Sequence, residues 1–571
     1  MIVNPGIRRN AAGIGASGAK ASFILDAKDR LVPRRAAGSS TPTFTRATTA
    51  TVVDFEGRLV TVPSGAARFQ GARFVYNQIP TTTEDFSNAA WTKANVTITA
   101  SVSAPDGTST ASTATSTAIN AQLFISAGPR AATLTFAESW FIRRRTGTGT
   151  VWMTPPNNGG DVVIPLTTSW QRVTCSSAGG GGACYIGLKF AVSGDAVDIW
   201  HPLLEEVTGQ SNQNPSDYVS VGVLSAPYHG AGIDGAKWFT TQNGNTVASN
   251  IVSEATGAVI ADATLKGYLS EGAGTQILAT ADIRDMTTAN WTLGATMTRA
   301  RTSVGIDGAS NTATRLTGGA VAATNIITTL ITAAATSRTY SAYVKRVTGT
   351  GIVRISQDNF ATNTDITSQL INGSWVLIQL NQTQLNAVMG FKIDTNGDAI
   401  DVDCNQFESG AVATSRMLAT GAARNKDLDT YAATGNIDPT QGSIYFQSYF
   451  TGSDFSSNPA MGGDSVGNRQ LGAYQSATVI RFYDGTNIND WTITSAASAT
   501  QKTVLTWGGT TMSLYVNGAQ IAPATKPFDG NFDITTLQIG GFAGNGQGLA
   551  IAACRVYNRV LSAAQAIAMT T

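Results

Sequence analysis

Short runs in which hydrophobic and polar residues alternate recur along nearly the whole chain. In the run 399–403 (AIDVD), the two aspartates fall on one face of an extended strand, and Ile400 and Val402 fall on the other. The runs 139–143 and 374–380 are likewise rich in β-branched and aromatic residues. Asn-Gly, Asp-Gly and Thr-Gly turns separate such runs at intervals of about 8–15 residues, which is typical of β-sandwiches. The pattern predicts an all-β chain.

One long segment of the chain occurs twice. The octapeptide 85–92 (DFSNAAWT) matches 285–292 (DMTTANWT), at an offset of 285 − 85 = 200 residues. Four more matches follow in the same order, with offsets between 201 and 205: 106–107 with 307–308, 146–149 with 348–351, 169–170 with 374–375, and 194–198 with 397–401. Five matches in one order are not chance. We therefore predict that residues 81–208 and 281–412 are two copies of one β-sandwich domain.

The segment 413–571 has a different pattern and is predicted to be a third sandwich. Its run 503–507 leads through two glycines into 513–518, as two strands joined by a tight turn do. The helical turn 562–567 is the only helix that the sequence predicts.

Three segments lie outside these sandwiches. Residues 1–40 are rich in glycine and alanine, and the first 35 carry seven basic against two acidic side chains, a net charge of 7 − 2 = +5. Such a segment cannot form a core alone, so we predict an extended arm that becomes ordered only against a partner. Residues 41–80 are predicted to be a β-hairpin connector, and residues 209–280 a hairpin-rich connector that orients the sandwiches. The predicted architecture is a tandem of jelly-roll β-sandwiches behind an extended N-terminal arm.

Composition narrows the classes of function. Only 13% of the 571 residues are charged, and 38 Lys and Arg balance 37 Asp and Glu. A chain with so little net charge has no strong electrostatic field. We therefore expect it to bind neither nucleic acid nor an anionic membrane surface. No run of eighteen apolar residues occurs, and the first residues lack the layout of a secretory signal. We therefore expect synthesis in the cytoplasm and no membrane insertion.

The four cysteines are too few for a disulfide framework in a chain of this length. Cys175 and Cys184 flank a glycine-rich run, so they either pair across a hairpin or stay free. Cys404 and Cys554 lie in apolar, β-like runs and are predicted to be buried thiols.

The residue types that catalysis requires are scarce. His201 and His229 are the only histidines, and neither has a second imidazole at ligand spacing or a recognisable nucleophile. This argues against a zinc site and against a Ser-His-Asp triad, so both histidines are predicted to be structural. Glu205 and Glu206 are adjacent and point to opposite faces of a strand, so they cannot share a substrate as glycoside hydrolysis requires.

The remaining acidic and glycine-rich motifs also favour structure over catalysis. Asp195 and Asp198 recur in the second copy as Asp398 and Asp401, where a turn or strand-end role is the favoured interpretation. The glycine run 179–182 lacks the Lys-Ser/Thr ending of a phosphate loop. The sequence predicts a protein that is not an enzyme and has no cofactor.

Sugar binding is the chemistry that the composition permits, because pyranose rings stack on Trp or Tyr while Asp and Asn contact hydroxyl groups. Tyr483, Asp484 and Trp491 lie among turn residues and are the candidate carbohydrate-binding residues; alternatively, the two aromatic residues belong to the core or an edge of the last sandwich. Asp464 and Asn468 offer one carboxylate, too few to predict a Ca²⁺ site. The tryptophans matched between the two copies are assigned to core packing: Trp91, Trp170, Trp291 and Trp375.

Several motifs resemble known families. An opening Trp, a pleated run and a late acidic strand ending in Glu make each copy resemble the carbohydrate-binding-module type of jelly roll. The order 514–518, 537–540 and 555–562 (LYVNG, LQIG, RVYNRVLS) resembles the concanavalin A-like, laminin-G-like jelly roll. Three stretches resemble modular bacteriophage virion proteins of the head-spike, head-fibre and tail-fibre types: 44–58, 84–93 with 105–108, and 229–235 with 267–271.

The virion resemblance implies a homo-oligomer, with a trimer favoured, on the virion surface. The N-terminal arm would bind other virion proteins, and the sandwiches would bind a glycan of the host cell surface. Two other functions stay open at this point. One is a capsid-decorating or connecting protein whose sandwiches only brace the shell. The other is a polysaccharide depolymerase, although the chain lacks the repeat of about 20–30 residues that would wind a β-helix.

Overall fold

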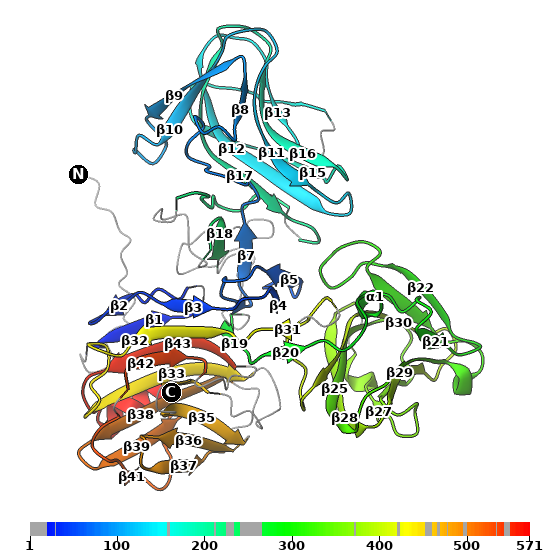
Figure 1. Ribbon diagram of the computed structural model, residues 1–571, viewed down its shortest axis with the longest axis vertical. Helices are drawn as coiled ribbons and strands as arrows, with labels where there is room; N and C mark the ends of the chain where they lie inside the picture. Colours follow the sequence, from blue (N-terminus) through cyan, green and yellow to red (C-terminus); the bar gives the residue numbers. More distant parts are fainter. Residues whose placement is uncertain are drawn as a thin grey trace.

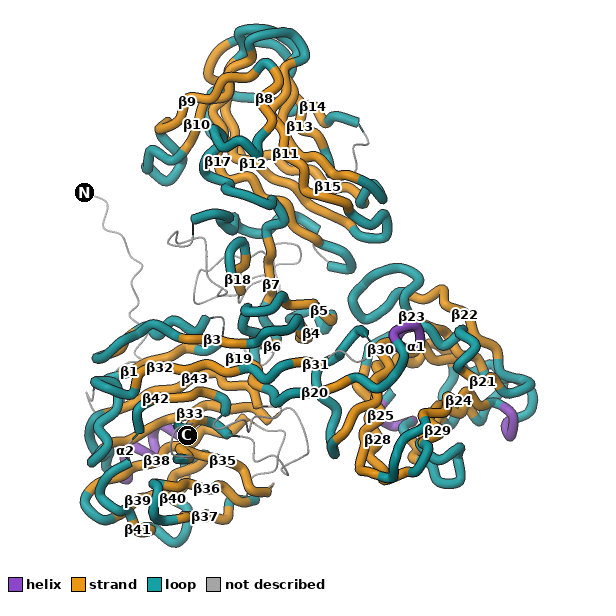
Figure 2. The backbone as a smooth tube through the Cα atoms, in the orientation of Figure 1, coloured by secondary structure: helices purple, strands orange, loops and turns teal. Residues whose placement is uncertain are grey.

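The computed structural model describes residues 20–28, 30–156, 160–210, 213–223, 233–239, 265–370, 373–419, 423–450, 460–464, 469–476, 478–494, 500–532, 534–541 and 549–571. Antiparallel strands make up about half of this part of the chain, and nearly all of the rest is loops and turns (Figure 2). The predicted all-β fold class is confirmed. Figure 1 shows three lobes: the first copy at the top, the second copy on the right, and at lower left a lobe that holds both the first described strands and the C-terminus.

The first copy, residues 81–208, is named module 1 and consists of two five-stranded sheets. In order across the first sheet, the strands are β15 (Gln171–Ala178), β12 (Thr135–Thr146), β17 (Ala196–Glu206), β10 (Ala111–Ser116) and β9 (Val96–Val102). Across the second sheet they are β14 (Val162–Val163), β13 (Val151–Thr154), β16 (Ala183–Phe190), β11 (Ala121–Pro129) and β8 (Thr92–Ala94). Phe86, Trp91 and Trp140 pack ring against ring in the core between the sheets.

The second copy, residues 281–412, is named module 2 and repeats this strand order. Its first sheet is β28 (Val376–Gln384), β25 (Thr336–Thr348), β30 (Ala399–Ser409), β23 (Ala313–Thr317) and β22 (Thr298–Ser303). Its second sheet is β27 (Thr364–Asp365), β26 (Val353–Ser356), β29 (Ala387–Ile393), β24 (Ile326–Ile331) and β21 (Trp291–Leu293). A short helix, α1 (Thr280–Arg284), lies at its start and is a second α-helix beside the one predicted.

Even the irregularities are shared between the modules. The pairing of β12 with β17 shifts register after Ser139, and the pairing of β25 with β30 shifts after Ser341. At this bulge His201 in module 1 and Cys404 in module 2 both adopt a positive φ, 49° and 52°. A non-glycine residue rarely takes this conformation, so its recurrence shows that the bulge is a property of the fold.

The third lobe is a sandwich of two larger sheets, here named the base. One sheet runs β2 (Arg35–Ala36), β1 (Phe23–Asp26), β43 (Leu549–Tyr557), β33 (Gly442–Phe450), β38 (Thr500–Gly508), β39 (Thr511–Val516) and β40 (Ala519–Gln520), joined at its sides by β19 (Gly267–Ser270), β6 (Phe69–Gln70) and β41 (Lys526–Pro527). The other runs β3 (Thr43–Thr45), β32 (Leu428–Ala432), β42 (Thr536–Ile539), β34 (Gly462–Gly463), β35 (Gln470–Ser476), β36 (Val479–Tyr483) and β37 (Ile488–Thr492). The predicted hairpin 503–518 is β38 and β39.

The predicted C-terminal helix is present as α2 (Ala563–Thr570). Ser562 and Gln565 form a capping box at its start. The helix packs on the outer face of the larger sheet, where Ala566 and Leu561 are buried against Tyr445 and Tyr515.

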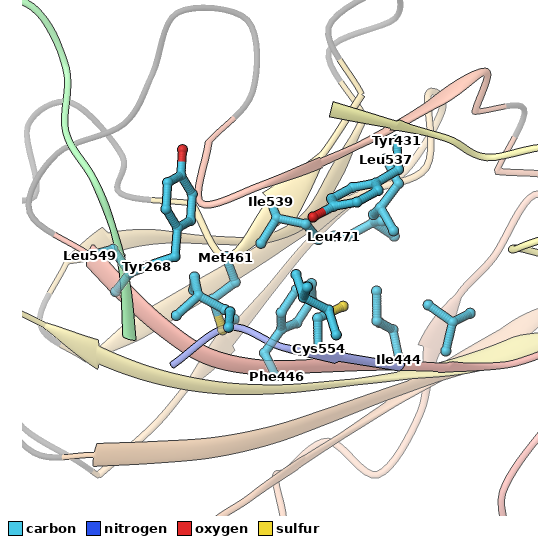
Figure 3. Packing of buried hydrophobic residues seen from close by; sticks show 14 of the residues in the cluster. Tyr268, Tyr431, Ile444, Phe446, Met461, Leu471, Leu537, Ile539, Leu549 and Cys554 are labelled. Atoms are coloured by element: carbon cyan, nitrogen blue, oxygen red, sulfur yellow. The ribbon is translucent and has the colours of Figure 1, made fainter. Parts of the chain in front are cut away.

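The base is assembled from segments that lie far apart in the sequence. β1 pairs with β43, which places Phe23 opposite Val556 and Leu25 opposite Cys554. Tyr268 of β19 lies in the same core, between the two sheets, with Tyr431 of β32 and Phe446 of β33 (Figure 3). Modules 1 and 2 are therefore inserted between strands of one sandwich.

This assembly changes the picture of the arm and of both connectors. Residues 20–28 and 30–40, the described part of the arm, are ordered against the C-terminal sandwich of the same chain, because Phe23 and Leu25 fill its core. In the connector 41–80 only β4 (Ala50–Val53) and β5 (Leu59–Val62) form the predicted hairpin. β7 (Arg73–Tyr76) pairs instead with β18 (Ala236–Phe239), so the two connectors bind each other.

A buried ionic cluster lies where the modules leave the base, and is named the junction cluster. It consists of Arg46, Arg68, Glu271, Arg424 and Asp427. Asp427 accepts a hydrogen bond from Arg46 Nη1 at 2.9 Å and contacts Arg68, while Glu271 Oε2 lies 2.9 Å from Arg68 Nη1 and 3.6 Å from Arg424 Nη1. Burial alone would raise the pKa of Glu271, but Arg424 and Arg68 outweigh it and lower that pKa to about 2. The cluster thus joins segments that are hundreds of residues apart.

Module 1 also contains a carboxyl group in its core. Glu138 on β12 is fully buried; its Oε1 accepts a hydrogen bond from Trp140 Nε1 at 2.6 Å, and Cys175 Sγ lies 3.8 Å from Oε2. Burial raises the pKa of Glu138 to about 8, although both hydrogen bonds lower it. At neutral pH the folded module therefore holds this carboxyl protonated.

We expect this group to make module 1 less stable as the pH rises. Between the ordinary pKa of 4.5 and the folded value of about 8, the folded state binds a proton that the unfolded state has released. The free energy of unfolding should fall across this interval, by about 5 kcal/mol at 1.36 kcal/mol per pH unit. The substitution Glu138→Gln keeps an acceptor for Trp140 and should remove this fall.

Urea unfolding followed by tryptophan fluorescence at pH 5 and pH 8 measures the difference. The control is Asp106→Asn, which changes an exposed carboxyl of the same module and should leave the fall in place. A Glu138→Gln protein with the same pH dependence as the parent protein would contradict the assignment.

Candidate functional site

The candidate residues of the last sandwich do not form a binding surface. Trp491 on β37 is fully buried in the base core, and its Nε1 donates to the Pro523 carbonyl oxygen at 3.1 Å. Its ring cannot stack on a ligand there. Tyr483 donates its hydroxyl to the Gly485 carbonyl at 2.6 Å, and the buried Asp484 carboxylate accepts from the Asn487 amide at 2.6 Å. The polar groups of this loop are used to hold the turn between β36 and β37.

The matched tryptophans divide into two pairs. Trp91 and Trp291 are 1% exposed and belong to the cores of their modules, as predicted. Trp170 and Trp375 are half-buried beneath cations: Arg143 Cζ lies 4.9 Å from the first ring and Lys345 Nζ 4.7 Å from the second. These are cation–π contacts on the outer face of the sheet rather than core packing.

The repeated aspartates are structural. Asp195 lies 3.2 Å from Arg144, and Asp398 lies 3.3 Å from Arg346. In module 1 the backbone at Gly147 lies so close to the Asp195 carboxylate that a Cβ there would be 1.8 Å from Asp195 Oδ1. The matching loop of module 2 is equally close to its own aspartate, Asp398. The repeated Thr-Gly-Thr-Gly motif is therefore a loop that closes over an ion pair.

The second repeated pair of aspartates is also engaged in ion pairs. Asp198 lies 2.8 Å from Arg143 Nε, and Asp401 lies 2.9 Å from Arg315 Nε. Both carboxylates are buried, so a structural role accounts for them.

His201 and the Glu205–Glu206 pair offer no acid–base chemistry. His201 is buried with its ring stacked 3.7 Å from that of Tyr218, and burial lowers its pKa to about 2, so it stays neutral. Glu205 is buried and accepts a hydrogen bond from the Ser216 amide at 2.5 Å, whereas Glu206 is exposed. His229 lies outside the described residues.

The described residues contain no group of three or more His, Cys, Asp or Glu side chains placed to hold a metal ion. Asp464 accepts hydrogen bonds from the Thr535 amide and the Thr536 hydroxyl, both at 2.8 Å, and Asn468 lies outside the described residues. Neither α-helix in the described part of the chain is long and apolar enough to cross a membrane.

All four cysteines are free thiols. Cys175 on β15 and Cys184 on β16 belong to opposite sheets of module 1, because the glycine-rich run between them crosses from one sheet to the other. The two strands are not a hairpin, which removes the geometry that a pairing would have used. Cys404 and Cys554 are fully buried, as predicted.

A groove on module 1 combines aromatic and polar side chains on the outer face of the second sheet. On β13 Val151 and Met153 point into the core, so Trp152 and Thr154 point outward. Gln122 and Phe124 of β11 and Tyr185 and Lys189 of β16 alternate in the same way. All of these outward side chains except Trp152 border a cavity of about 360 Å³, and Trp152 lies beside it, next to Lys189.

A glycine, here called the floor, lies between these side chains in the strand order of the sheet. Gly187 on β16 is paired with Phe124 on one side and Thr154 on the other. A Cβ at Gly187 would lie 2.1 Å from the Leu123 carbonyl oxygen, so the close pairing of β16 with β11 requires glycine here. The bare backbone leaves room between the aromatic side chains.

Aromatic rings and hydrogen-bonding groups surround this floor. The rings of Phe124 and Tyr185 meet edge to face at 5.6 Å, and Tyr185 is 38% exposed. Lys189 Nζ lies 5.7 Å from the Trp152 ring and 3.1 Å from Asp161 Oδ2. Asp161 is the one carboxylate among the described residues that line the groove. The surface can stack on a flat apolar face and bind hydroxyl groups, but it lacks the carboxylate pair of a glycosidase.

Module 2 has the same floor without the aromatic rings. Gly390 replaces Gly187 and is paired with Thr328 and Ser356. Thr328 therefore occupies the place of Phe124, and by the same pairings Arg354 replaces Trp152 and Val388 replaces Tyr185. The scaffold is common to both modules, but only module 1 has the aromatic groove.

Comparisons with known proteins leave this chain without a family. No family model matches it, and no curated protein matches it. Among solved structures, a tandem pair of CBM22 domains from Paenibacillus barcinonensis Xyn10C matches at 11% identity and a TM-score of 0.19, over 61% of this chain and 99% of that chain. The CBM22-1 xylan-binding domain of the same enzyme matches at 13% identity and a TM-score of 0.18, over 25% and 97%.

A Trypanosoma rangeli sialidase in complex with the inhibitor DANA matches at 15% identity and a TM-score of 0.21, over 25% of this chain and 26% of that chain. At these TM-scores the likenesses assign no function to the chain. The sites are therefore argued from its own residues.

Proposed function

We propose that the chain binds a polysaccharide through the aromatic groove of module 1. The observation that carries this proposal is the outward placement of Phe124, Trp152 and Tyr185 around the bare backbone of Gly187. Module 2 forms the same sheet with Thr, Arg and Val at the matching positions, so the shared fold does not require aromatic residues there. Exposed aromatic rings that the fold does not need are the usual means of holding pyranose rings.

The proposed setting is a bacteriophage virion, as a surface spike or fibre of the head or tail. The virion-like stretches 44–58, 84–93 and 229–235 support it. In this setting the protein is a homo-oligomer, with a trimer favoured, attached to other virion proteins through its N-terminal arm. Several copies would present several grooves to one host surface, so that weak individual binding becomes strong attachment.

The test is binding of the full-length chain to a panel of bacterial surface polysaccharides, on a glycan array and by affinity electrophoresis. We expect Trp152→Ala and Tyr185→Ala each to weaken binding about 5- to 30-fold, the loss expected for one stacking contact of about 1–2 kcal/mol. Arg354→Ala and Val388→Ala, at the matching positions of module 2, should bind as the parent protein does. All four side chains face outward, so thermal unfolding should show that every variant is folded.

Equal binding by the parent protein and the two module 1 variants would overturn the groove as the site. Failure to bind any host or non-host polysaccharide would overturn glycan binding and leave the capsid-decorating role. We propose that the protein is not an enzyme, so no reducing ends should appear when the bound polysaccharide is incubated with it. Their release would establish a depolymerase instead.

A further inference from the structure

The face of module 1 that carries the aromatic groove is nearly free of charge. Among the strand positions that point outward from this sheet, Lys189 is the one with a charged side chain. The row of paired residues through it runs across four strands: Gln122, Lys189, Trp152 and Val163. Directly opposite residues of a sheet point to the same face, so these four side chains lie next to one another on the outer surface.

Module 2 has charged residues along the same row. Its members are Ile326, Lys392, Arg354 and Asp365. Only the lysine is kept between the modules. Where module 2 has the arginine and the aspartate, module 1 has Trp152 and Val163, so two charges are absent from the face that has the aromatic rings.

The remaining charge on this face of module 1 is neutralised by a carboxylate. Asp161, in the loop between β13 and β14, lies 3.1 Å from Lys189 Nζ and accepts a hydrogen bond from Thr154 Oγ1, also at 3.1 Å. Both members of the ion pair border the groove, and their side chains are 30% and 29% exposed. A ligand in the groove can therefore contact the pair, and it meets no net charge there.

This arrangement treats neutral and acidic sugars differently. A hydroxyl group both donates and accepts, so it can donate to Asp161 or accept from Lys189 while the ion pair stays intact. A sugar carboxylate is acceptor-only. It gains the Lys189 ammonium only by competing with Asp161 for it, and it brings two negative charges close together, which disfavours binding.

We infer that the groove selects uncharged sugars and that Asp161 is the residue that determines this selection. The inference rests on the proposed function, since it names the class of polysaccharide that the same groove takes, a neutral one. Asp161 acts by occupying a cation, Lys189, that would otherwise attract acidic glycans to the aromatic surface.

The test uses the full-length chain and matched pairs of polysaccharides. The probes are all the panel polysaccharides that bind, each in two forms: an acidic one with its carboxyl-reduced form, and a neutral one with the form whose primary hydroxyls are oxidised to carboxylates. Titration calorimetry should show that the neutral form of each pair binds at least about fivefold more tightly. Equal or tighter binding of the acidic forms would overturn the inference but leave the proposed function standing. Absence of binding to every polysaccharide would overturn the proposed function itself.

The decisive variant is Asp161→Asn. It keeps an acceptor for Thr154, removes the negative charge and frees the Lys189 ammonium. The affinity for the acidic form, relative to that for the neutral form, should rise about 5- to 20-fold, because a sugar carboxylate can then take Lys189 for itself. Since the charges are accessible to solvent, this gain should shrink between about 0.05 M and 0.5 M sodium chloride. A gain in affinity distinguishes selection from a structural role, because a damaged groove would only lose binding.

Module 2 supplies the matched control. Asp394 lies 3.0 Å from Lys392, the lysine that matches Lys189, so Asp394→Asn frees the same cation on a face without aromatic rings. This variant should keep the relative affinity of the parent protein. The double variant Asp161→Asn/Lys189→Met should lose the gain. An unchanged relative affinity in Asp161→Asn, an equal gain in Asp394→Asn, or a gain that persists in the double variant would each overturn the inference.

Discussion

We expect Asp427→Ala to destabilise the base by about 3–5 kcal/mol, the usual cost of removing one partner from a buried ion pair. Asp427 is fully buried, accepts from Arg46 at 2.9 Å and contacts Arg68. Alanine would leave both guanidinium groups in the protein interior without this carboxylate. Because these residues join β3, β6 and β32 to one another, the loss should appear in the unfolding transition of the base.

Differential scanning calorimetry of the full-length chain, together with urea unfolding, measures this loss. The matched control is Asp490→Ala, which removes an ion pair of similar geometry on the surface of the same sandwich. Arg481 Nε lies 2.7 Å from Asp490 Oδ1, but the two side chains are 29% and 40% exposed. Its removal should cost less than about 1 kcal/mol. Equal losses in the two variants would mean that the junction cluster does not hold the base together.

The duplication was predictable because some matched residues lie where the backbone conformation and the close packing admit only one residue type. Gly147 and Gly349 have φ values of 82° and 79°, and neither position has room for a Cβ beside its aspartate. Such positions keep their residue type in both copies, while the strands between them diverge. At these two positions the sequence match therefore marks a loop that closes over an ion pair in both modules.

The assembly of the base could not be predicted in the same way. β1 is four residues long and lies in a glycine- and alanine-rich, basic segment, so its local composition indicates an arm. Its partner β43 begins at Leu549, and no local pattern specifies a pairing over such a distance. The same holds for β19, whose four residues pair with β43 and β6.

The carbohydrate candidates show the limit of composition as a guide to a site. Aromatic and turn residues lie together at Tyr483 and Trp491, which makes both residues candidates, but strand alternation places Trp491 in the core. The aromatic residues of the groove lie inside strands, where composition alone suggests a core. A position-by-position comparison of the two copies provides the missing signal, because Phe124 matches a threonine and Tyr185 matches a valine.

Removal of residues 1–40 should unfold the base, whereas removal of residues 1–19 should leave it folded. The longer deletion removes β1, and with it Phe23 and Leu25, which are fully buried between the sheets. Phe23→Ala alone should cost about 3–5 kcal/mol, as large-to-small substitutions of buried aromatic residues do. The shorter deletion keeps all four residues of β1. Calorimetric transitions of the three proteins, compared with the parent chain, measure these differences.

This distinction decides how attachment to a virion can be tested. If the 1–40 deletion fails to join particles, the cause can be an unfolded base rather than a missing anchor, since β43 would lose the strand beside it. Only the 1–19 deletion, with its base intact, tests whether the N-terminal segment makes the contact. A 1–40 deletion with an unchanged base transition would contradict the role of β1, because a sandwich cannot lose a central pair of buried side chains without a loss of stability.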